Sequence, residues 1–205
     1  MVEICAVGGY NEVGKNSTAV KIGDEVYIFD LGIHLENYIK YTHDEDIVSI
    51  NAKELINAGA VPDISTISDW KDKVKMILPT HAHLDHIGAI PYLANNFKAP
   101  VMCTPFTSAV LSSIILDNKI KFSNKIRSMS ANSSFNVSKN VKIEFIHMTH
   151  STPQTVMIAL HTDEGIILYA NDFKLDLTPT LGKKPNFKRL EELGNEKVLA
   201  LICDS

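Results

Sequence analysis

Two patterns of apolar and polar positions follow one another along the chain. Short runs of β-branched and aromatic residues, separated by glycine-bearing breaks, predict a meander of three strands at 3–7, 18–22 and 26–31. A polar stretch from Glu36 to Ser49 comes next, followed by a predicted short helix at 52–58. We expect the segment from His34 to Asp69 to decorate the surface.

From Val74 the pattern alternates between strand and helix, which predicts crossover connections that cover a sheet. The strands are VKMIL and PVMC, and the helices begin after Asp85 and cover 107–116. Three further strands are predicted in VKIEFIHM, QTVMIALHT and GIILYAND, followed by a short helix at 187–193 and the strand VLALIC. This order predicts a mixed α/β (α+β) protein.

Length and composition fit one domain with its own core, since the chain has 205 residues, 45% of them hydrophobic. No apolar run reaches the roughly 18 residues of a membrane span, and the N-terminus lacks the order of a signal peptide. We therefore expect a soluble cytoplasmic protein that enters no membrane. Three widely separated cysteines in apolar runs predict buried small side chains. The formal charge of -4 indicates no general affinity for nucleic acid, so an RNA-related function must rest on motifs.

The densest group of candidate metal ligands is His81-Ala82-His83-Leu84-Asp85-His86, directly after a predicted strand. Alternate residues of an extended loop project to the same side, so His81 and His83 can hold one cation together. Asp85 and His86, where the chain turns into a helix, then face a neighbouring position. Four ligands this close favour two adjacent ions. The alternative is a loop of solvated surface histidines, against which the ligand spacing argues.

Two later loops offer further ligands: His150 in MTHSTPQ and Asp172 in YANDFKLD, each after a β-rich run. His150 can complete three imidazoles around the first ion. Asp172 can bridge two ions that lie about 3.5 to 4 Å apart. Taken alone, either residue could equally be an ordinary loop residue.

The segment HAHLDH matches the H-x-H-x-D-H signature of the metallo-β-lactamase superfamily, whose fold is an αββα sandwich. Five other segments are more specific: GGYNEVGKN at 8–16, FDLG at 29–32, THSTPQ at 149–154, NDFKLDLTP at 171–179 and VLALICDS at 198–205. With them the chain resembles the ribonuclease J family, of the β-CASP group, over nearly its whole length. The resemblance implies an RNA phosphodiesterase, a 5′-to-3′ exonuclease and occasional endonuclease. It would act on 5′-monophosphorylated single-stranded RNA through a metal-held hydroxide.

Position by position, the resemblance assigns His81, His83 and His150 to the first metal. It assigns Asp85 and His86 to the second metal and Asp172 to both, and it makes Asp85, His86 and Asp172 the catalytic residues. Asp30 would accept hydrogen bonds behind the ligands and orient them, although a turn carboxylate before Gly32 is the alternative. Two Zn2+ ions are expected because imidazole and carboxylate suit zinc, and the same donors also accept Mn2+.

The resemblance also implies that residues 1–205 are the N-terminal part of a metallo-β-lactamase domain. Its sandwich would be incomplete, with the β-CASP domain, a seventh metal ligand and the phosphate-binding residues lying beyond this chain. We therefore expect weak or single-site metal occupancy and little nuclease activity from these residues alone. Asn171 stands where the family generally has glycine, which predicts crowding in the loop that presents Asp172. Whether copies assemble into a homo-oligomer stays open.

Residues 9–16 nearly spell a phosphate-binding P-loop, but Asn16 replaces the Ser or Thr that would hold magnesium, and a strand follows instead of a helix. We predict a tight glycine turn near the metal site. Four histidines lack ligand spacing and stay outside the ligand set: His34, His43, His147 and His161. One basic cluster could contact a phosphate backbone, although a solvated loop is the simpler interpretation: Lys174, Lys183, Lys184, Lys188 and Arg189.

Two alternatives to an RNA phosphodiesterase stay open. One is another hydrolase on the same fold, acting on a thioester or a lactam, which would share the metal site without needing GGYNEVGKN or NDFKLD. The other is a non-catalytic interaction fragment, which would bind no transition metal.

Overall fold

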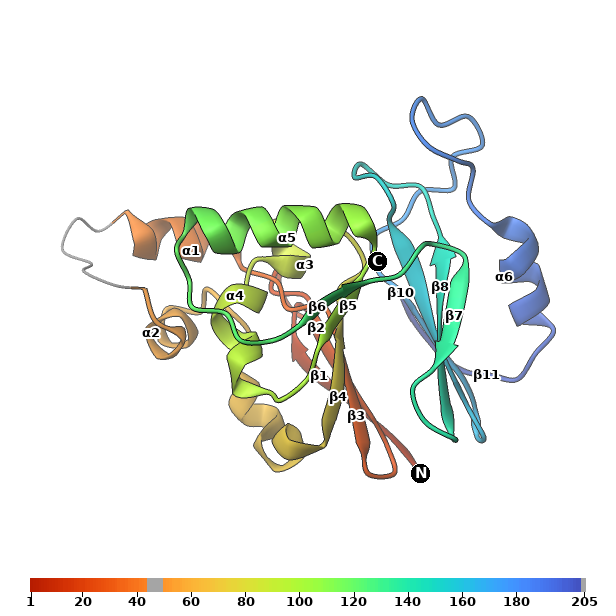
Figure 1. Cartoon of the computed structure of the whole chain (residues 1–205), viewed down its shortest axis with the longest axis horizontal. Helices are drawn as coiled ribbons and strands as arrows, with labels where there is room; N and C mark the ends of the chain where they lie inside the picture. The colour runs from red at the N-terminus through yellow and green to blue at the C-terminus, as the bar shows by residue number, and fades with distance from the viewer. Residues whose placement is uncertain (44–49, 204–205) are drawn as a thin grey trace.

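The computed structural model describes residues 1–43 and 50–203 and contains two facing β-sheets with helices on their outer sides (Figure 1). Within those residues the first sheet has the strand order β1-β2-β3-β4-β5-β6: β1 (Val2–Gly8), β2 (Ser17–Ile22), β3 (Glu25–Phe29), β4 (Val74–Leu78), β5 (Val101–Cys103) and β6 (Ile126–Ser128). The second sheet has the order β11-β10-β9-β8-β7: β7 (Ser133–Asn136), β8 (Val141–His147), β9 (Val156–Thr162), β10 (Gly165–Ala170) and β11 (Val198–Cys203).

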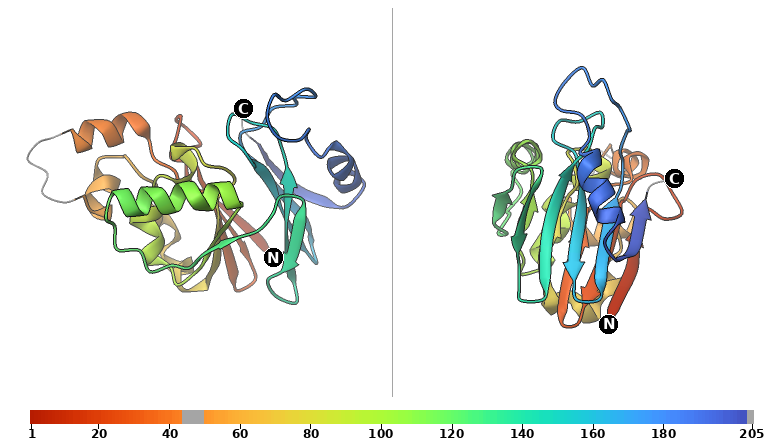
Figure 2. Two further views of the ribbon diagram at one scale, coloured as in Figure 1. Left: turned by 45° about the horizontal axis from the view of Figure 1, so that its top comes forward. Right: turned by 90° about the vertical axis from the view of Figure 1, so that its right-hand side faces the viewer.

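Helices cover both outer faces of the sandwich. On the first sheet lie α1 (Leu35–Thr42), α2 (Ala52–Asn57), α3 (Leu84–Ile87), α4 (Ile90–Leu93) and α5 (Pro105–Asp117), with the 3-10 helices η1 (Ile64–Lys73) and η2 (Ala94–Asn96). On the second sheet lies α6 (Phe187–Gly194), which Figure 2 shows against the outer face. The layers therefore follow the predicted αββα order.

Strand pairing confirms both sequence patterns. β1, β2 and β3 form the predicted meander with antiparallel pairs, whereas β3, β4, β5 and β6 run parallel to one another. Parallel neighbours need long crossover connections, which the helices between them provide. In the second sheet β7 to β10 pair antiparallel, and β11 joins β10 in parallel.

The core is layered in the same way as the secondary structure. Along β3 successive side chains point to opposite faces, so Val26 and Ile28 pack under the helices while Tyr27 and Phe29 pack against the second sheet. The rings of Phe29 and Tyr169 stack between the sheets with centroids 4.7 Å apart. A separate apolar cluster lies between the second sheet and α6. Burial on both faces fixes the register of the strands that end at the site.

Several expectations are wrong or incomplete. The segment from His34 to Asp69 does more than decorate the surface, because Leu55, Val61 and Ile67 are buried against the first sheet. Its polar stretch contains α1, which the pattern did not predict, and residues 44–49 of that stretch lie outside the described residues. Cys103 is buried as predicted, but Cys5 is only half-buried and Cys203 is exposed. Among the described helices, none has the length and apolar composition to cross a membrane.

Candidate metal centre

The predicted ligand segment lies where β4 ends and the chain turns into α3. His83 is still extended, with φ -72° and ψ 148°, and stands at the N-cap of α3. Backbone hydrogen bonds hold the turn from the side of β3: the N–H of Leu31 donates to the carbonyl of His86 at 2.8 Å, and that of Ile33 donates to the carbonyl of Leu84 at 3.1 Å. The extended loop and the short helix are therefore supported by the segment that follows β3.

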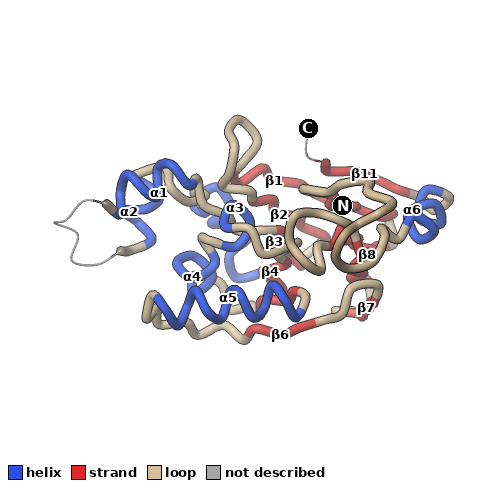
Figure 3. Tube along the Cα trace, turned by 90° about the horizontal axis from the view of Figure 1, so that it is seen from above, coloured by secondary structure: helices blue, strands red, loops and turns tan. Residues whose placement is uncertain are grey.

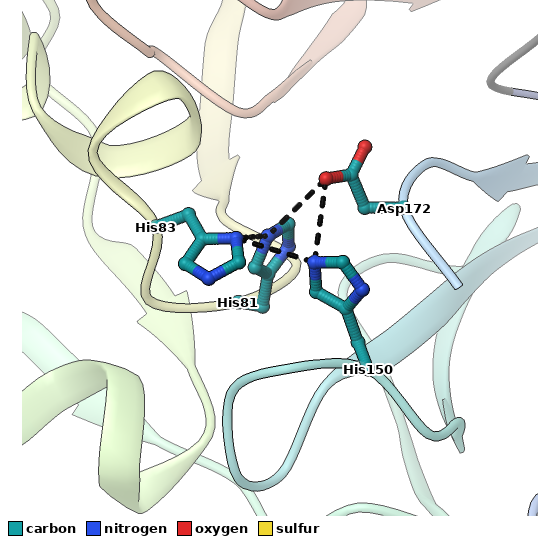
Figure 4. A group of neighbouring side chains, drawn as sticks. All are labelled: His81, His83, His150 and Asp172. Atoms are coloured by element: carbon teal, nitrogen blue, oxygen red, sulfur yellow. Dashed lines mark hydrogen bonds and ion pairs between the residues drawn. The ribbon is translucent and has the colours of Figure 1, made fainter. Parts of the chain in front are cut away.

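A first group of donors combines three imidazoles with a carboxylate (Figure 4). Its members are His81, His83, His150 and Asp172, whose ligand atoms all lie within 4.8 Å of one another. His83 Nδ1 lies 3.0 Å from His81 Nε2 and 3.2 Å from His150 Nε2. Ligands bound to tetrahedral zinc at 2.0–2.1 Å stand about 3.3 Å apart. The three nitrogens therefore have the spacing that one cation requires.

A second group lies next to the first and shares one residue with it. It consists of Asp85, His86 and Asp172. The Oδ2 atom of Asp172 is 3.4 Å from His86 Nε2 and 3.4 Å from His150 Nε2, so this oxygen lies between the two groups. All six residues expected as metal ligands are brought together, and the arrangement offers two adjacent cation positions.

Asp30 lies behind these donors and is completely buried. It accepts hydrogen bonds from the Thr80 N–H at 2.8 Å and the Thr80 hydroxyl at 3.1 Å, and from His86 Nδ1 at 2.8 Å. Since the Thr80 hydroxyl directs its proton to Asp30, it accepts from His81 Nδ1, 3.0 Å away. Both histidines thus turn Nε2 towards the cluster, as outer hydrogen-bond partners do for metal-binding imidazoles.

Two further contacts to the cluster were missed from the sequence. Asn16 Nδ2 lies 3.3 Å from Asp85 Oδ2 and 3.1 Å from His86 Nε2. Ser151 Oγ lies 3.2 Å from the outer nitrogen, Nε2, of His83. The available signals were the position of Asn16 in the quoted motif GGYNEVGKN and the place of Ser151 directly after His150.

Burial and charge hold most of the cluster in the form that binds a cation. Burial lowers the pKa of His81 to about 2, assisted by the neighbouring His86, and burial also lowers the pKa of His83. Burial alone would raise the pKa of Asp172, but hydrogen bonds from His150 and His86 outweigh it and lower that pKa. Neutral imidazoles and ionised carboxylates are the forms that bind metals.

His86 differs from the other imidazoles. Burial alone would lower its pKa, but the Asp30 carboxylate and its acidic neighbours raise the pKa well above the usual value. A cation at Nε2 would therefore replace a proton. With this exchange, the donor set fits divalent metal ions of the zinc type.

Two carboxylates of the site sit on left-handed backbone, with φ 54° at Asp30 and φ 46° at Asp172. Non-glycine residues rarely adopt this conformation, and it concentrates at functional sites. Asn171, expected to crowd this loop, donates a hydrogen bond to the Tyr169 hydroxyl at 3.0 Å, and Asp172 still reaches the cluster.

Three of the four histidines set aside from the ligand set have other partners, and His43 is exposed. His34 caps α1 by accepting a hydrogen bond from the N–H of Asn37 at 3.2 Å. His147 Nε2 contacts the Lys183 carbonyl at 2.9 Å, and His161 pairs with Glu144 at 2.8 Å. Residues 9–16 lead into β2 and not into a helix, and their turn lies at the cluster, as predicted.

Two facing sheets with outer helices and a histidine and aspartate cluster at the strand ends define a metallo-β-lactamase fold. The sequence matches the Beta-lactamase superfamily domain over residues 57–182, and the chain belongs to this superfamily. A protein of unknown function from Enterococcus faecalis has the same fold with a TM-score of 0.63, at 20% identity over 84% of this chain and 43% of the other. Zn2+-bound PqqB from Methylobacterium extorquens has a TM-score of 0.54 at 13% identity, covering 93% of this chain and 60% of PqqB.

At the level of particular proteins, the chain is similar to ribonuclease J. It is 38% identical to Ribonuclease J of Methanocaldococcus jannaschii over all of this chain and 46% of that protein. It is 39% identical to Ribonuclease J of Pyrococcus abyssi over all of this chain and 45% of that protein. The chain thus spans about half the length of these relatives.

Proposed function

We propose that this chain carries the metal centre of a metal-dependent RNA phosphodiesterase of the ribonuclease J type. The observation that carries the proposal is the position of Asp172 Oδ2, 3.4 Å from a histidine nitrogen of each donor group. A single carboxylate between two donor groups suits a two-metal centre, in which paired cations stabilise both the attacking and the leaving oxygens of a phosphodiester displacement.

Each residue of the cluster has a role in this proposal. His81, His83 and His150 would hold the first cation, Asp85 and His86 would hold the second, and Asp172 would contribute to both. When bound, the cations activate a water molecule and neutralise charge on the phosphodiester. Asp30 and Thr80 keep the two buried imidazoles pointed at the cations. We assign to the Asp172 carboxylate the further role of accepting the proton that an attacking water would lose.

Zinc is the metal we propose, with manganese as the alternative ion. Three imidazole nitrogens and one carboxylate oxygen in the first group are donors that zinc favours, whereas a carboxylate-rich position accepts manganese as well. PqqB, which shares the fold, is described as Zn2+-bound.

RNA is the proposed substrate because the similarity to proteins named Ribonuclease J extends over the whole chain at 38% and 39% identity. Solved structures that share the fold include a protein of unknown function at 20% identity and two metallo-β-lactamases at 12% and 18% identity. We further propose hydrolysis of 5′-monophosphorylated single strands, mainly from the 5′ end. We also propose that residues 1–205 are the N-terminal part of a longer protein. The experiments that test the RNA substrate therefore use the full-length protein.

The experiment measures hydrolysis of a 3′-labelled, 5′-monophosphorylated RNA by the full-length protein and its variants. Asp85→Ala and His86→Ala each remove a donor of the second group and are expected to lower the rate by about a hundredfold or more. The matched controls Asp63→Ala and His43→Ala change the same residue types at exposed positions and should retain the activity. Unchanged hydrolysis in the first pair would overturn the proposal.

A substrate panel separates RNA cleavage from other hydrolytic chemistry. Thioester or lactam turnover without RNA cleavage would reject the RNA assignment and leave a hydrolase of another specificity. Elemental analysis that finds no transition metal at saturating supply would reject an enzymatic role for the centre.

A further inference from the structure

A groove of about 680 Å³ opens beside the metal centre, and His150 belongs to the walls of both. One wall is the loop at 149–154, between β8 and β9, and the other includes the loop at 174–183, between β10 and α6. Both loops rise from the same end of the strands of the second sheet (Figures 1 and 2), and Figure 3, seen from above, places them over the strand ends. The groove therefore continues the metal centre along these strand ends.

Backbone contacts anchor the second loop in place. The N–H of Lys174 donates to the Thr149 carbonyl at 2.7 Å, which forms an isolated β-bridge between these residues. At the far end the N–H of Asn186 donates to the His147 carbonyl at 3.0 Å. The imidazole of His147 also contacts the Lys183 carbonyl at 2.9 Å. The groove wall is therefore a built part of the fold, tied at both ends to β8 and its following loop.

The described groove walls carry two lysines and one carboxylate, that of Asp176, so their net charge is positive. Lys174 and Lys183 line the groove, and neither has an ion pair with any residue that the structure describes. By contrast, Arg189 of the same basic cluster is bound by Glu144 at 2.7 Å and by Glu192 at 3.2 Å. Asp176, the acidic residue among the described wall residues, already accepts a hydrogen bond from the Thr178 N–H at 2.8 Å.

The remaining wall is mixed in character. Pro153 and Leu181 supply apolar surface, and Asn132 and Thr180 supply polar atoms. Apolar surface beside hydrogen-bonding groups and lysines suits the bases, sugars and phosphates of an unpaired strand. The volume falls within the roughly 300–1,000 Å³ of pockets that bind small organic molecules, which is room for about two nucleotides and not for a duplex.

We propose that this groove holds nucleotides of single-stranded RNA next to the phosphodiester at the metal centre, with Lys174 and Lys183 on their phosphates. The inference rests on the proposed function and adds a residue-level binding site to it. It assigns phosphate contacts to Lys174 and Lys183 of the basic cluster and assigns none to Arg189.

The test measures binding of a fluorescent single-stranded RNA to the full-length protein at several salt concentrations. All samples carry Asp172→Asn, so that hydrolysis does not consume the RNA. Each phosphate contact on a single strand contributes about 0.7 to the slope of log affinity against log salt. The double variant Lys174→Gln with Lys183→Gln is expected to reduce the magnitude of that slope by about 1.4. This change corresponds to a roughly tenfold loss of affinity at about 0.15 M salt.

The matched control is Lys184→Gln with Lys188→Gln, which removes the same charge from neighbouring positions outside the groove walls. It should change the slope by less than about 0.3. An equal loss in both double variants would mean a general charge effect and would overturn the groove site. A parallel cleavage assay uses protein without Asp172→Asn. If that protein cleaves RNA while the Lys174 and Lys183 variant binds normally, the groove alone is overturned. If it does not cleave RNA and the Asp172→Asn protein does not bind it, the proposed function is overturned too.

A second measurement tests whether the groove is open in the full-length protein. Lysine-reactive labelling with mass spectrometry should modify Lys174 and Lys183 without RNA, and added RNA should protect them but not Lys184. Protection of both lysines in the absence of RNA would mean that the protein itself fills the groove, which overturns the proposal.

Discussion

His86 and Asp30 are joined by a hydrogen bond of 2.8 Å between Nδ1 and Oδ2, and both side chains are completely buried. Asp30 follows β3, and His86 lies in α3, so this bond connects the first sheet to the ligand loop across 56 positions of sequence. The same carboxylate binds Thr80, which in turn contacts His81. Asp30 is not itself a candidate ligand, but it orients His86 of the second group directly and His81 of the first group through Thr80.

The role of Asp30 predicts the effect of Asp30→Asn, which keeps the shape and removes the charge. The Thr80 N–H donates to Oδ1 of Asp30 and His86 Nδ1 to Oδ2, and in asparagine one of these two oxygens is replaced by an NH2 group that cannot accept. We expect zinc affinity to fall about 10- to 100-fold, measured by competition with a chelator. Asp63→Asn, at an exposed carboxylate that caps η1, is the control. Equal affinities in the two variants would contradict an orienting role.

A side chain at Gly32 is expected to cause a severe packing defect, because this glycine lies against the backbone of the ligand loop at Asp85. A Cβ atom at this position would lie 1.5 Å from the carbonyl oxygen of Asp85, so the two backbones approach closely only because glycine has no side chain. Gly32→Ala should lower the free energy of unfolding by more than about 3 kcal/mol in urea denaturation. Gly194→Ala, where a Cβ meets nothing within 4 Å, should stay close to wild type. Two similar stabilities would refute the close approach.

The sequence alone predicted the ligand segment because its chemistry is local. His81, His83, Asp85 and His86 fall within six positions, and the period of an extended loop followed by a helix turn is enough to group them. His150 and Asp172 required the resemblance, since nothing in their own loops distinguishes a ligand from an ordinary polar residue. Local pattern thus predicts four candidate ligands, and only the fold brings the two distant candidates to them.

Contacts behind the ligands could not be predicted, because they depend on how distant segments pack. Asn16 reaches Asp85 across 69 positions, and Thr80 reaches Asp30 across 50. Among secondary structures, α1 was missed because it has no buried residue, and β7 because its Ser133–Asn136 sequence is largely polar. Hydrophobic periodicity carries little signal for elements of this kind.

Acid stability should depend on Glu144, whose side chain is 13% exposed. Burial alone would raise its pKa, but hydrogen bonds from His161 and Arg189 outweigh it and lower the pKa to about 2. A lowered pKa in the folded state contributes stability above the unfolded pKa, and that contribution is lost as pH falls from about 4.5 to about 2. Glu144→Gln should therefore cost on the order of 2 kcal/mol at pH 7 and less than half of that at about pH 3.

Urea denaturation at the two pH values measures this difference. Glu191→Gln, which neutralises an exposed glutamate of α6, is the control and should show little change at either pH. A cost of Glu144→Gln that is the same at both pH values would indicate that packing, and not charge, accounts for the effect.

The shared position of Asp172 predicts unequal losses of metal. Asp85→Ala removes a donor from the second group alone, so the first group, with three imidazoles and Asp172, should still hold about one zinc per chain. Asp172→Ala removes a donor from both groups, so zinc content should fall below that of Asp85→Ala in elemental analysis after dialysis. Asp163→Ala, at an exposed turn, should keep the wild-type content. Because an oxygen that belongs to two donor groups must affect two cations, equal zinc contents in Asp85→Ala and Asp172→Ala would show that Asp172 does not bridge.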